Sequence, residues 1–292
     1  MSEIFADPPT LITALTIAFS VGALGLLVVE LVWLGLRRVL TWRRVKEMAA
    51  SYSTLLPAIG VDFLLGAGLV ALFFAVGALS PWSIPVTWWT ALLCVLAVDF
   101  VYYWEHRIEH RVRVLWALYH SVHHSSPVFD QSTAYRISFV DFFFGPLFFL
   151  PLVLIGFDPL LVLIGLGFVL AYQTWIHTES IGRLGFLDAV FNTPANHRVH
   201  HGTEPAYIDR NYGGFLIVWD RLFGTYAPER ETPRYGLVEP IGSVNPLRVH
   251  LHEALGLWRD LVNARGFRHA LRILTQPPGA DRGLEPEVRT DP

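Results

Sequence analysis

The chain has 292 residues, of which 53% are hydrophobic and only 16% are charged, with a formal net charge of −3. Soluble domains carry about 25% charged residues, so this composition favours an integral membrane protein. The nearly balanced charge gives no indication of nucleic-acid binding. A single cysteine, Cys94, excludes an intramolecular disulfide, and its apolar surroundings predict a small buried side chain.

Apolar stretches long enough to cross a membrane as helices follow one another along the first part of the chain. They lie at about 11–36, 55–80, 86–104, 139–157 and 159–176. The last two are separated by a break at Asp158 and Pro159, so they form either a tight transmembrane hairpin or a pair that enters the membrane and returns. The sequence therefore predicts an all-α, multi-pass membrane bundle of about four to five spans.

Basic residues indicate how this bundle is oriented. The segment after the first stretch is basic, whereas residues 1–10, 80–86 and 157–159 contain no lysine or arginine. Its basic residues are Arg37, Arg38, Arg43, Arg44 and Lys46. The positive-inside rule places this segment in the cytoplasm, and counting the crossings places residues 105–138 and 177–292 on the same face. Lys46 is the only lysine, a bias typical of GC-rich genomes, so a bacterial inner membrane is the expected location.

Nine of the twelve histidines lie in two windows that this topology brings to one face. The motif H-x-x-H-H occurs twice, in YHSVHHSS and NHRVHHGT, and further histidines precede the copies in WEHRIEHR and WIHTES. The nine are His106, His110, His120, His123, His124, His177, His197, His200 and His201. Residues i, i+3 and i+4 share a helix face, so each copy offers two or three imidazole nitrogens to a metal. Nine ligands exceed the four to six of one ion, so a cytoplasmic helical cap with a two-metal site is predicted.

Three acidic residues within the apolar stretches are candidates for supporting roles. Asp99 lies within about 20° of His106 and of His110 around a helix. We therefore expect its carboxylate behind these two ligands, where it would fix their tautomers. Glu30 and Asp62 have no such spacing and are expected to make structural polar contacts.

Beyond residue 228 the chain becomes more soluble in character. Residues 245–274 begin with an Asn-Pro cap signal and have helical periodicity, which predicts an amphipathic helix lying on the domain or on the membrane surface. Its histidines, His250, His252 and His269, lack ligand spacing and are expected on the surface. The polar, proline-rich end of the chain predicts disorder. The predicted regions are an N-terminal transmembrane region (1–92), a catalytic domain (93–228) and a cytoplasmic helix with its tail (229–292).

The stretch HRIEH allows an interpretation from another class of enzyme. Read as H-x-x-E-H, it is the pattern of inverzincin hydrolases, with His106 and His110 as zinc ligands and Glu109 as general base. This mechanism needs two histidines and one further ligand, and it leaves the other seven histidines without a role. A non-catalytic metal carrier or sensor is a further alternative.

The histidines together resemble the three histidine boxes of the fatty acid hydroxylase/sterol desaturase superfamily, H-x3-H, H-x2-HH and H-x2-HH. The resemblance covers about residues 93–228, and NTPANHRVHHG, YIDRNYGG and LIVWDRLFGTY are most similar to the alkylglycerol monooxygenase branch. The boxes are His106/His110, His120/His123/His124 and His197/His200/His201. The additional histidine that precedes the last box in the family is matched by His177, whereas Gln173 stands where some members have another ligand.

The resemblance implies a membrane enzyme that holds two iron ions, activates O2 and hydroxylates or desaturates a C–H bond of a lipid from the bilayer. Two electrons would come from outside, because the sequence has no dinucleotide-binding, haem or iron–sulfur motif. The donor is either a redox partner protein or tetrahydropterin, which alkylglycerol monooxygenases use. The branch favours hydroxylation, while an ether lipid, a fatty acyl chain and a sterol-like lipid all stay open as substrates, as does the oligomeric state.

Overall fold

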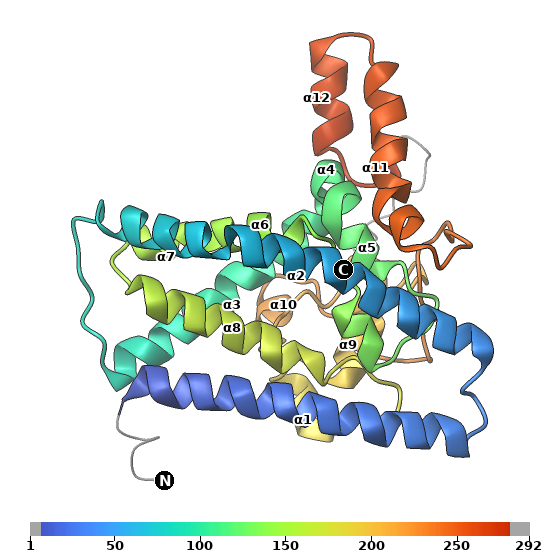
Figure 1. The fold of residues 1–292 in the computed structure, drawn as a ribbon, viewed down its shortest axis with the longest axis horizontal. Coiled ribbons are helices and arrows are strands. Elements are labelled where there is room, and N and C mark those ends of the chain that lie inside the picture. Colours follow the sequence, from blue (N-terminus) through green and yellow to red (C-terminus); the bar gives the residue numbers. More distant parts are fainter. Residues whose placement is uncertain (1–6, 281–292) are drawn as a thin grey trace.

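The computed structural model describes residues 7–280, and these form helices, turns and loops without any β-strand. Four long helices run side by side (Figure 1). They are α1 (Pro8–Leu36), α2 (Trp42–Gly77), α3 (Trp88–Arg111) and α8 (Pro159–Thr174). Helix α8 packs against both α1 and α3, around a core that contains Val98, Val162 and Val169. The predicted all-α class is therefore confirmed for the described residues.

Capping residues decide where the long helices begin. Asp7 accepts a hydrogen bond from Thr10 N at the start of α1, and Thr41 accepts one from Arg44 N at the start of α2. Thr87 forms a reciprocal pair with the third residue of α3. Each of these contacts satisfies a backbone N–H that has no partner within its helix. The apolar stretches therefore become helices with defined first residues.

Two helices, α1 and α2, are each long and apolar enough to cross a membrane. Only 6% of the most apolar window of each is buried within the protein. Their apolar side chains therefore face outwards, and Phe63 is 86% exposed. A helix that exposes this much apolar surface is stabilised by lipid rather than by water.

The predicted span at 139–157 is not one regular α-helix. It is divided into α6 (Asp141–Phe144), a 3-10 turn at Gly145–Phe149 and α7 (Leu150–Leu154). The helical run Asp141–Leu154 is shorter than the predicted stretch, and its 3-10 part lies where Pro146 and Pro151 lack the backbone N–H that a regular α-helix would need. Helix α8 begins at the predicted residue but has 16 residues, fewer than the about 20 that a spanning helix usually has.

The turn between α7 and α8 nevertheless lies level with the last residues of α2. Ile84 N, in the loop after α2, donates to Gly156 O at 2.8 Å. A Cβ on Gly77 would lie 2.8 Å from Pro159, and Gly156 has a φ of +102°, which favours glycine. This turn and the loop after α2 therefore form one end of the bundle, opposite the basic segment 37–46.

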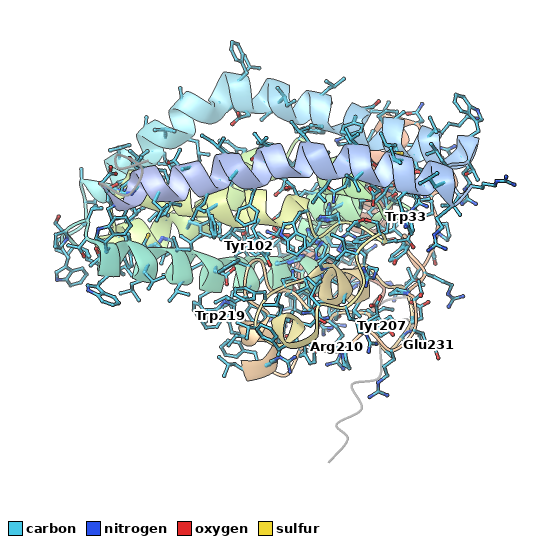
Figure 2. All side chains as sticks on the ribbon, turned by 90° about the horizontal axis from the view of Figure 1, so that it is seen from below. Trp33, Tyr102, Tyr207, Arg210, Trp219 and Glu231 are labelled. Carbon is cyan, nitrogen blue, oxygen red and sulfur yellow. The ribbon has the colours of Figure 1, made fainter. Side chains whose placement is uncertain are left out.

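The shorter helices and the loops between them gather on one side of the long helices. They include α4 (Arg113–Leu115), α5 (Ser121–His124), α9 (Pro194–His200) and α10 (Val218–Leu222). Figure 2 shows Trp219, Arg210 and Tyr207 in this part of the chain, beside the layer of long helices. The loops therefore form a second layer against the bundle.

A hairpin of α11 (Pro246–Val262) and α12 (Phe267–Thr275) projects crosswise to the long helices (Figure 1). The single amphipathic helix expected over 245–274 was wrong, because the chain turns at 263–266 and Gly266 has a φ of +107°. The surface position expected for His250 was also wrong, since its ring is buried and stacks on Phe139. Most of the predicted disordered tail lies outside the described residues.

Candidate metal centre

The nine histidines singled out by the sequence lie together beside the end of the bundle that carries the basic segment. They form two groups, and within each group the ligand nitrogens lie within 4.8 Å of one another. The five-histidine group consists of His106, His110, His120, His124 and His200. The four-histidine group consists of His123, His177, His197 and His201. All are buried except His123, which is half-buried.

The two copies of H-x-x-H-H are divided between the groups in opposite ways. In the first copy the outer histidines, His120 and His124, join the five-histidine group, and the middle one joins the other group. In the second copy the outer two join the four-histidine group, and the middle one, His200, joins the five. Residue i+4 lies about 40° to one side of residue i around a helix, and i+3 lies about 60° to the other side. Each copy of the motif therefore directs histidines to both groups from a single helical turn, and the two copies together contribute three histidines to each group.

Ring nitrogens face one another at short distances within each group. In the five-histidine group, His106 Nε2 lies 3.0 Å from His120 Nε2, and His124 Nε2 lies 3.0 Å from His200 Nε2. In the four-histidine group, His177 Nε2 lies 2.8 Å and 3.2 Å from two others. Two nitrogens that bind one ion at about 2.1 Å and at a right angle are about 3.0 Å apart. The spacing is therefore that of neighbouring ligands on a metal.

Hydrogen bonds on the other side of the rings show that His106 and His177 each direct an Nε2 lone pair at the other rings of their group. His106 Nδ1 donates to Tyr212 O, and His177 Nδ1 donates to Gln173 O, both at 2.8 Å. A carbonyl oxygen only accepts, so Nδ1 holds the proton and Nε2 of the neutral ring has none. A lone pair that lies about 3 Å from the other ring nitrogens of its group is placed to bind a cation shared with them. The residues present therefore fit a metal ion in each group.

Burial keeps these rings in the neutral form that binds metals. It lowers the pKa of His123 to about 4. Burial also lowers the pKa of His120 and of His200 well below the usual range, and neighbouring histidines lower both further. At neutral pH the groups are therefore sets of imidazole nitrogens, a donor set that suits iron, zinc and copper.

The segment 209–213 closes over the five-histidine group and orients its rings. Arg210 O accepts from His200 Nδ1 at 3.0 Å, next to the carbonyl of Tyr212 described above. Asp209 and Asn211 have φ values of +60° and +57°. This left-handed conformation is uncommon, but Asp and Asn tolerate it because their short polar side chains form local hydrogen bonds. Because only every second residue of this segment has a positive φ, the carbonyls of Arg210 and Tyr212 both face histidines.

Two carboxylates to which the sequence assigned no ligand partner lie against histidine rings. Glu109 Oε2 is 2.7 Å from His120 Nδ1, and Asp209 Oδ1 is 3.6 Å from His110 Nδ1. A carboxylate behind an imidazole fixes the tautomer and raises the basicity of the ligand nitrogen. The position of Glu109 disfavours the inverzincin hypothesis, since its carboxylate is engaged with a ring instead of being free to activate water. The sequence singled out Glu109 only through the H-x-x-E-H pattern, and it assigned no role to Asp209, which lies in YIDRNYGG.

The expected contact of Asp99 with the histidines was wrong. Its carboxylate accepts hydrogen bonds from Phe215 N at 2.6 Å, Leu216 N at 3.1 Å and Trp219 Nε1 at 2.8 Å. The helical angle is as predicted, but seven residues of helix separate Asp99 from His106 by about 10 Å along the axis. Asp99 therefore anchors the loop beside the histidines rather than the histidines themselves.

Asp220 and two glycines hold the same loop. Asp220 accepts from Tyr212 N at 2.8 Å and from Gly213 N at 2.7 Å. A Cβ on Gly213 would lie 2.4 Å from a backbone oxygen, and one on Gly214 would lie 2.7 Å from Tyr102. Distances under about 3.0 Å are not found for real Cβ atoms. The YIDRNYGG stretch therefore needs both glycines so that its carbonyls reach the histidines.

The first long helix contributes a buried carboxylate to the histidine loops. Glu30 is 1% exposed and accepts hydrogen bonds from Gln131 N at 2.7 Å and from Thr178 Oγ1. Thr178 directly follows His177 in the chain. Glu30 thus makes a polar contact, as expected, whereas Asp62 lies exposed on α2.

Helix α2 holds the same loops through charged side chains. Arg44 Nη2 lies 2.7 Å from Glu179 Oε2, and Glu47 Oε2 lies 3.0 Å from Arg136 Nη1. Arg136 in turn donates to Ser125 Oγ at 2.7 Å, directly after the first H-x-x-H-H. The first two helices therefore supply contacts to both histidine windows, although their sequences contain no recognisable motif.

A cavity of ≈ 1010 Å³, which we call the chamber, lies between the five-histidine group and the α11–α12 hairpin. His110, His124 and His200 contribute to one wall, and hairpin residues form the wall opposite. The lining mixes apolar with polar side chains. It includes Trp116, Leu237, Ile273, Arg113, Asp260 and Asn263. The chamber therefore has both apolar and polar lining beside the histidines.

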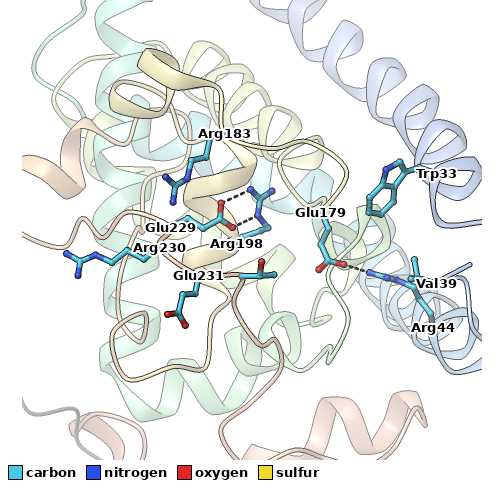
Figure 3. A pocket seen from close by; sticks show the side chains of 10 residues that line it. Trp33, Val39, Arg44, Glu179, Arg183, Arg198, Glu229, Arg230 and Glu231 are labelled. Atoms are coloured by element: carbon cyan, nitrogen blue, oxygen red, sulfur yellow. Dashed lines mark hydrogen bonds and ion pairs between the residues drawn. The ribbon is translucent and has the colours of Figure 1, made fainter. Parts of the chain in front are cut away.

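A second pocket, of ≈ 580 Å³, lies where α1 and α2 meet the loops around the four-histidine group. Figure 3 shows its two central ion pairs, Arg44 with Glu179 and Arg198 with Glu229. Arg198 reaches both carboxylate oxygens of Glu229, at 2.6 and 2.8 Å. Because each arginine is paired with a carboxylate from another segment, the two ion pairs at this pocket hold the loops in place.

Residues near the histidines that are not in the two groups make other contacts. The Gln173 side chain accepts from Tyr102 OH at 3.0 Å, and its backbone oxygen holds His177. Neither His252 nor His269 belongs to either group, although His269 lines the chamber.

Residues 91–225, which contain both histidine windows, match the model of the family described as fatty acid hydroxylase. This part of the chain belongs to the fatty acid hydroxylase family. The resemblance inferred from the sequence is therefore confirmed. The matched range includes Asp99, Glu109, Asp209 and Asp220, whereas Glu30 and the α2 contacts lie outside it.

The chain is 43% identical over 199 residues to an alkylglycerol monooxygenase of Xenopus tropicalis and 42% identical over 199 residues to one of Homo sapiens. Each match covers 68% of this chain and 44% of the relative. An ornithine lipid hydroxylase of Rhizobium tropici is 36% identical over 147 residues, which are 49% of this chain and 44% of that protein. The chain thus matches less than half the length of these relatives. No solved structure matches it.

Proposed function

We propose that this chain is an integral membrane oxygenase that hydroxylates a lipid C–H bond. The observation that carries the proposal is the division of nine histidines into two groups whose ring nitrogens face one another at the spacing of metal ligands. The rings of His124 and His201, one from each group, stack at 4.3 Å, so the two ions would be neighbours. The similarity to alkylglycerol monooxygenases and to an ornithine lipid hydroxylase supports the class of reaction.

Two iron ions held by the nine histidines would supply the activation of O2. The overall reaction places one oxygen atom of O2 in the C–H bond and reduces the other to water, with two electrons and two protons consumed. Glu109, 2.7 Å from His120 Nδ1, would keep that ring in the tautomer that presents Nε2 to a metal, and Asp209, 3.6 Å from His110 Nδ1, would favour the same tautomer of His110. The electrons would come from a redox partner protein or from tetrahydropterin.

The chamber supports a substrate whose reacting carbon lies close to a polar head. Arg113, Asp260 and Asn263 line the same cavity as three histidines of the five-histidine group. A polar head bound by such groups would keep the first tail carbons beside the histidines. In an alkylglycerol the carbon next to the ether oxygen has this position, so we propose an ether lipid as the substrate.

The bundle would lie across a bacterial inner membrane with the histidines at the cytoplasmic face. Helices α1, α2 and α3 and the α7–α8 pair would cross, since the α7–α8 turn lies level with the end of α2. The basic segment 37–46 lies at the histidine end, in agreement with the positive-inside rule. Cysteines introduced for Arg43 and Arg183 should react only with reagents that reach the cytoplasm, and one for Trp82 only with external reagents. Equal labelling of all three would contradict this arrangement.

Isotope labelling tests the function directly. The purified protein in nanodiscs, given iron, a reductant and a 1-O-alkylglycerol, should incorporate one atom of ¹⁸O from ¹⁸O2 into the product. The His200→Ala variant should lose this activity, because it removes a ligand of the five-histidine group. Turnover without O2 that disappears in Glu109→Gln would instead support the zinc hydrolase.

A further inference from the structure

The α11–α12 hairpin has two faces of different character. Its inner face closes the chamber, and Leu257 and Ile273 are buried against Ala117 at its base. Both hairpin carboxylates, Glu253 and Asp260, line the chamber. Both acidic side chains of the hairpin therefore lie on its inner face.

The outer face is apolar and basic. On α11, Leu255, Trp258 and Val262 recur at a helical spacing that gives one stripe, and all three are exposed. On α12, Phe267 is 81% exposed and Leu271 is also exposed at the next turn. Arginines border these stripes on the exposed surface. They are Arg265, Arg268 and Arg272. Apolar stripes that include tryptophan and are bordered by arginine are typical of helices that lie in a membrane interface.

The direction of the hairpin agrees with such a position. The long helices α1 and α2 expose the apolar lengths that would cross the membrane. The hairpin projects crosswise to them, so it would run parallel to the membrane plane (Figure 1). It is attached beside the histidine groups, at the end of the bundle that carries the basic segment.

We propose that the outer face of the α11–α12 hairpin docks on the anionic headgroup layer of the same membrane, beside the bundle. The arginines select anionic lipids by charge, and Trp258, Val262, Phe267 and Leu271 enter the interface. The chamber wall would then lie at headgroup level, so a lipid would pass from the bilayer to the five-histidine group without crossing water. This inference rests on the membrane arrangement of the proposed function and deepens it by naming the route of the substrate.

A fluorescent probe tests the docking without any need for turnover or metal. Val262→Cys, which replaces a side chain that is 65% exposed, would carry an environment-sensitive fluorophore in the full-length protein in nanodiscs. The matched control is Thr232→Cys, an exposed loop residue outside the hairpin. Native Cys94 is buried, so the unsubstituted protein measures background labelling.

We expect a blue-shifted emission at position 262 and quenching by lipids spin-labelled near the headgroup, at least threefold stronger than at position 232. Replacing neutral lipid with anionic lipid should increase the quenching. The triple variant Arg265→Gln, Arg268→Gln, Arg272→Gln should remove this increase, whereas Arg183→Gln with Arg230→Gln should not. Water-like emission at 262 in both lipids would overturn the proposal. A blue shift at position 262 that depends on protein concentration and not on lipid would also overturn the proposal. It would assign the outer face to contact with a second copy of the chain.

A kinetic measurement separates this inference from the proposed reaction. Phe267→Ser with Leu271→Ser should raise the KM for a bilayer-embedded alkylglycerol several-fold and leave the KM for a short-chain, water-soluble analogue unchanged. An equal change for both substrates would contradict the route. If neither substrate reacts, the proposed function fails, while the fluorescence result still decides the docking.

Discussion

Glu30, inside the first long helix, accepts a hydrogen bond from the hydroxyl of Thr178, the residue that follows His177. The same carboxylate accepts from the backbone N–H of Gln131. A helix outside the matched family domain therefore fixes the loop that carries one candidate ligand of the four-histidine group.

Removing the Glu30 carboxylate should weaken metal binding in the four-histidine group. Glu30→Ala leaves the Gln131 N–H and the Thr178 hydroxyl buried without this acceptor, at a cost of about 1–3 kcal/mol for each group. We expect iron in the purified protein to fall from about two ions per chain towards one. Elemental analysis by mass spectrometry would measure this ratio.

The matched control is Asp62→Ala, which removes the exposed acid of the second long helix. It should keep the metal content of the unsubstituted protein. Glu30→Gln, which keeps one acceptor oxygen, should lie between the two. Full metal content in Glu30→Ala would show that the hydrogen bonds of Glu30 to Gln131 and Thr178 do not position a ligand.

Glu109 should matter more for metal retention than Asp99, contrary to the expectation from the helical angle. Glu109→Gln removes the charge behind His120, and such partners typically change metal affinity about 10- to 100-fold. Asp99→Asn disturbs only the loop at Phe215 to Trp219, so it should lower Tm with less effect on affinity. Competition with a chelator of known affinity, together with thermal melts, would separate the effects. A greater loss of affinity in Asp99→Asn would refute this assignment.

The two groups should be separable by single substitutions. His123→Ala removes a ligand candidate from the four-histidine group, and His200→Ala removes one from the five. Each variant should lose about one ion per chain, with different residual Mössbauer signals after loading with ⁵⁷Fe. His269→Ala, which lines the chamber but belongs to neither group, should keep both ions. Identical residual signals in the first two variants would contradict the division.

Stability of the metal-free protein should fall in acid. Burial holds the pKa of His123 at about 4, whereas an imidazole in an unfolded chain titrates near about 6.5. Between these values the unfolded state binds more protons than the folded state, so the stabilisation is complete above about pH 6.5 and is lost as the pH falls towards about 4. His120 and His200, whose pKa values are also lowered, should add to the loss. Thermal melts of stripped protein at several pH values test this, and an unchanged Tm below about pH 6 would refute it.

Local signals in the sequence were sufficient for the longest helices and for the set of candidate ligands. Caps such as Asp7 and Thr41 act within one helical turn, and the long apolar stretches needed no partner to predict α1 and α2. The spacing of the histidine boxes likewise depends only on helix geometry. The local signal was less precise at 139–157, where the helical run is shorter than the apolar stretch and has a 3-10 part near Pro146 and Pro151.

The sequence by itself determined which nine histidines gather and that each doubled motif presents two helix faces. Only the tertiary structure decided which group each face serves, because the partner rings come from helices and loops far away in the chain. Glu30 and Gln131 are 101 residues apart, and Asp209 meets His110 across a similar distance in sequence. No periodicity connects such pairs, so their contacts follow from the packing of α1, α2 and the 209–213 segment around the histidines. That packing made Glu109 a partner of His120 and placed Asp99 against the neighbouring loop.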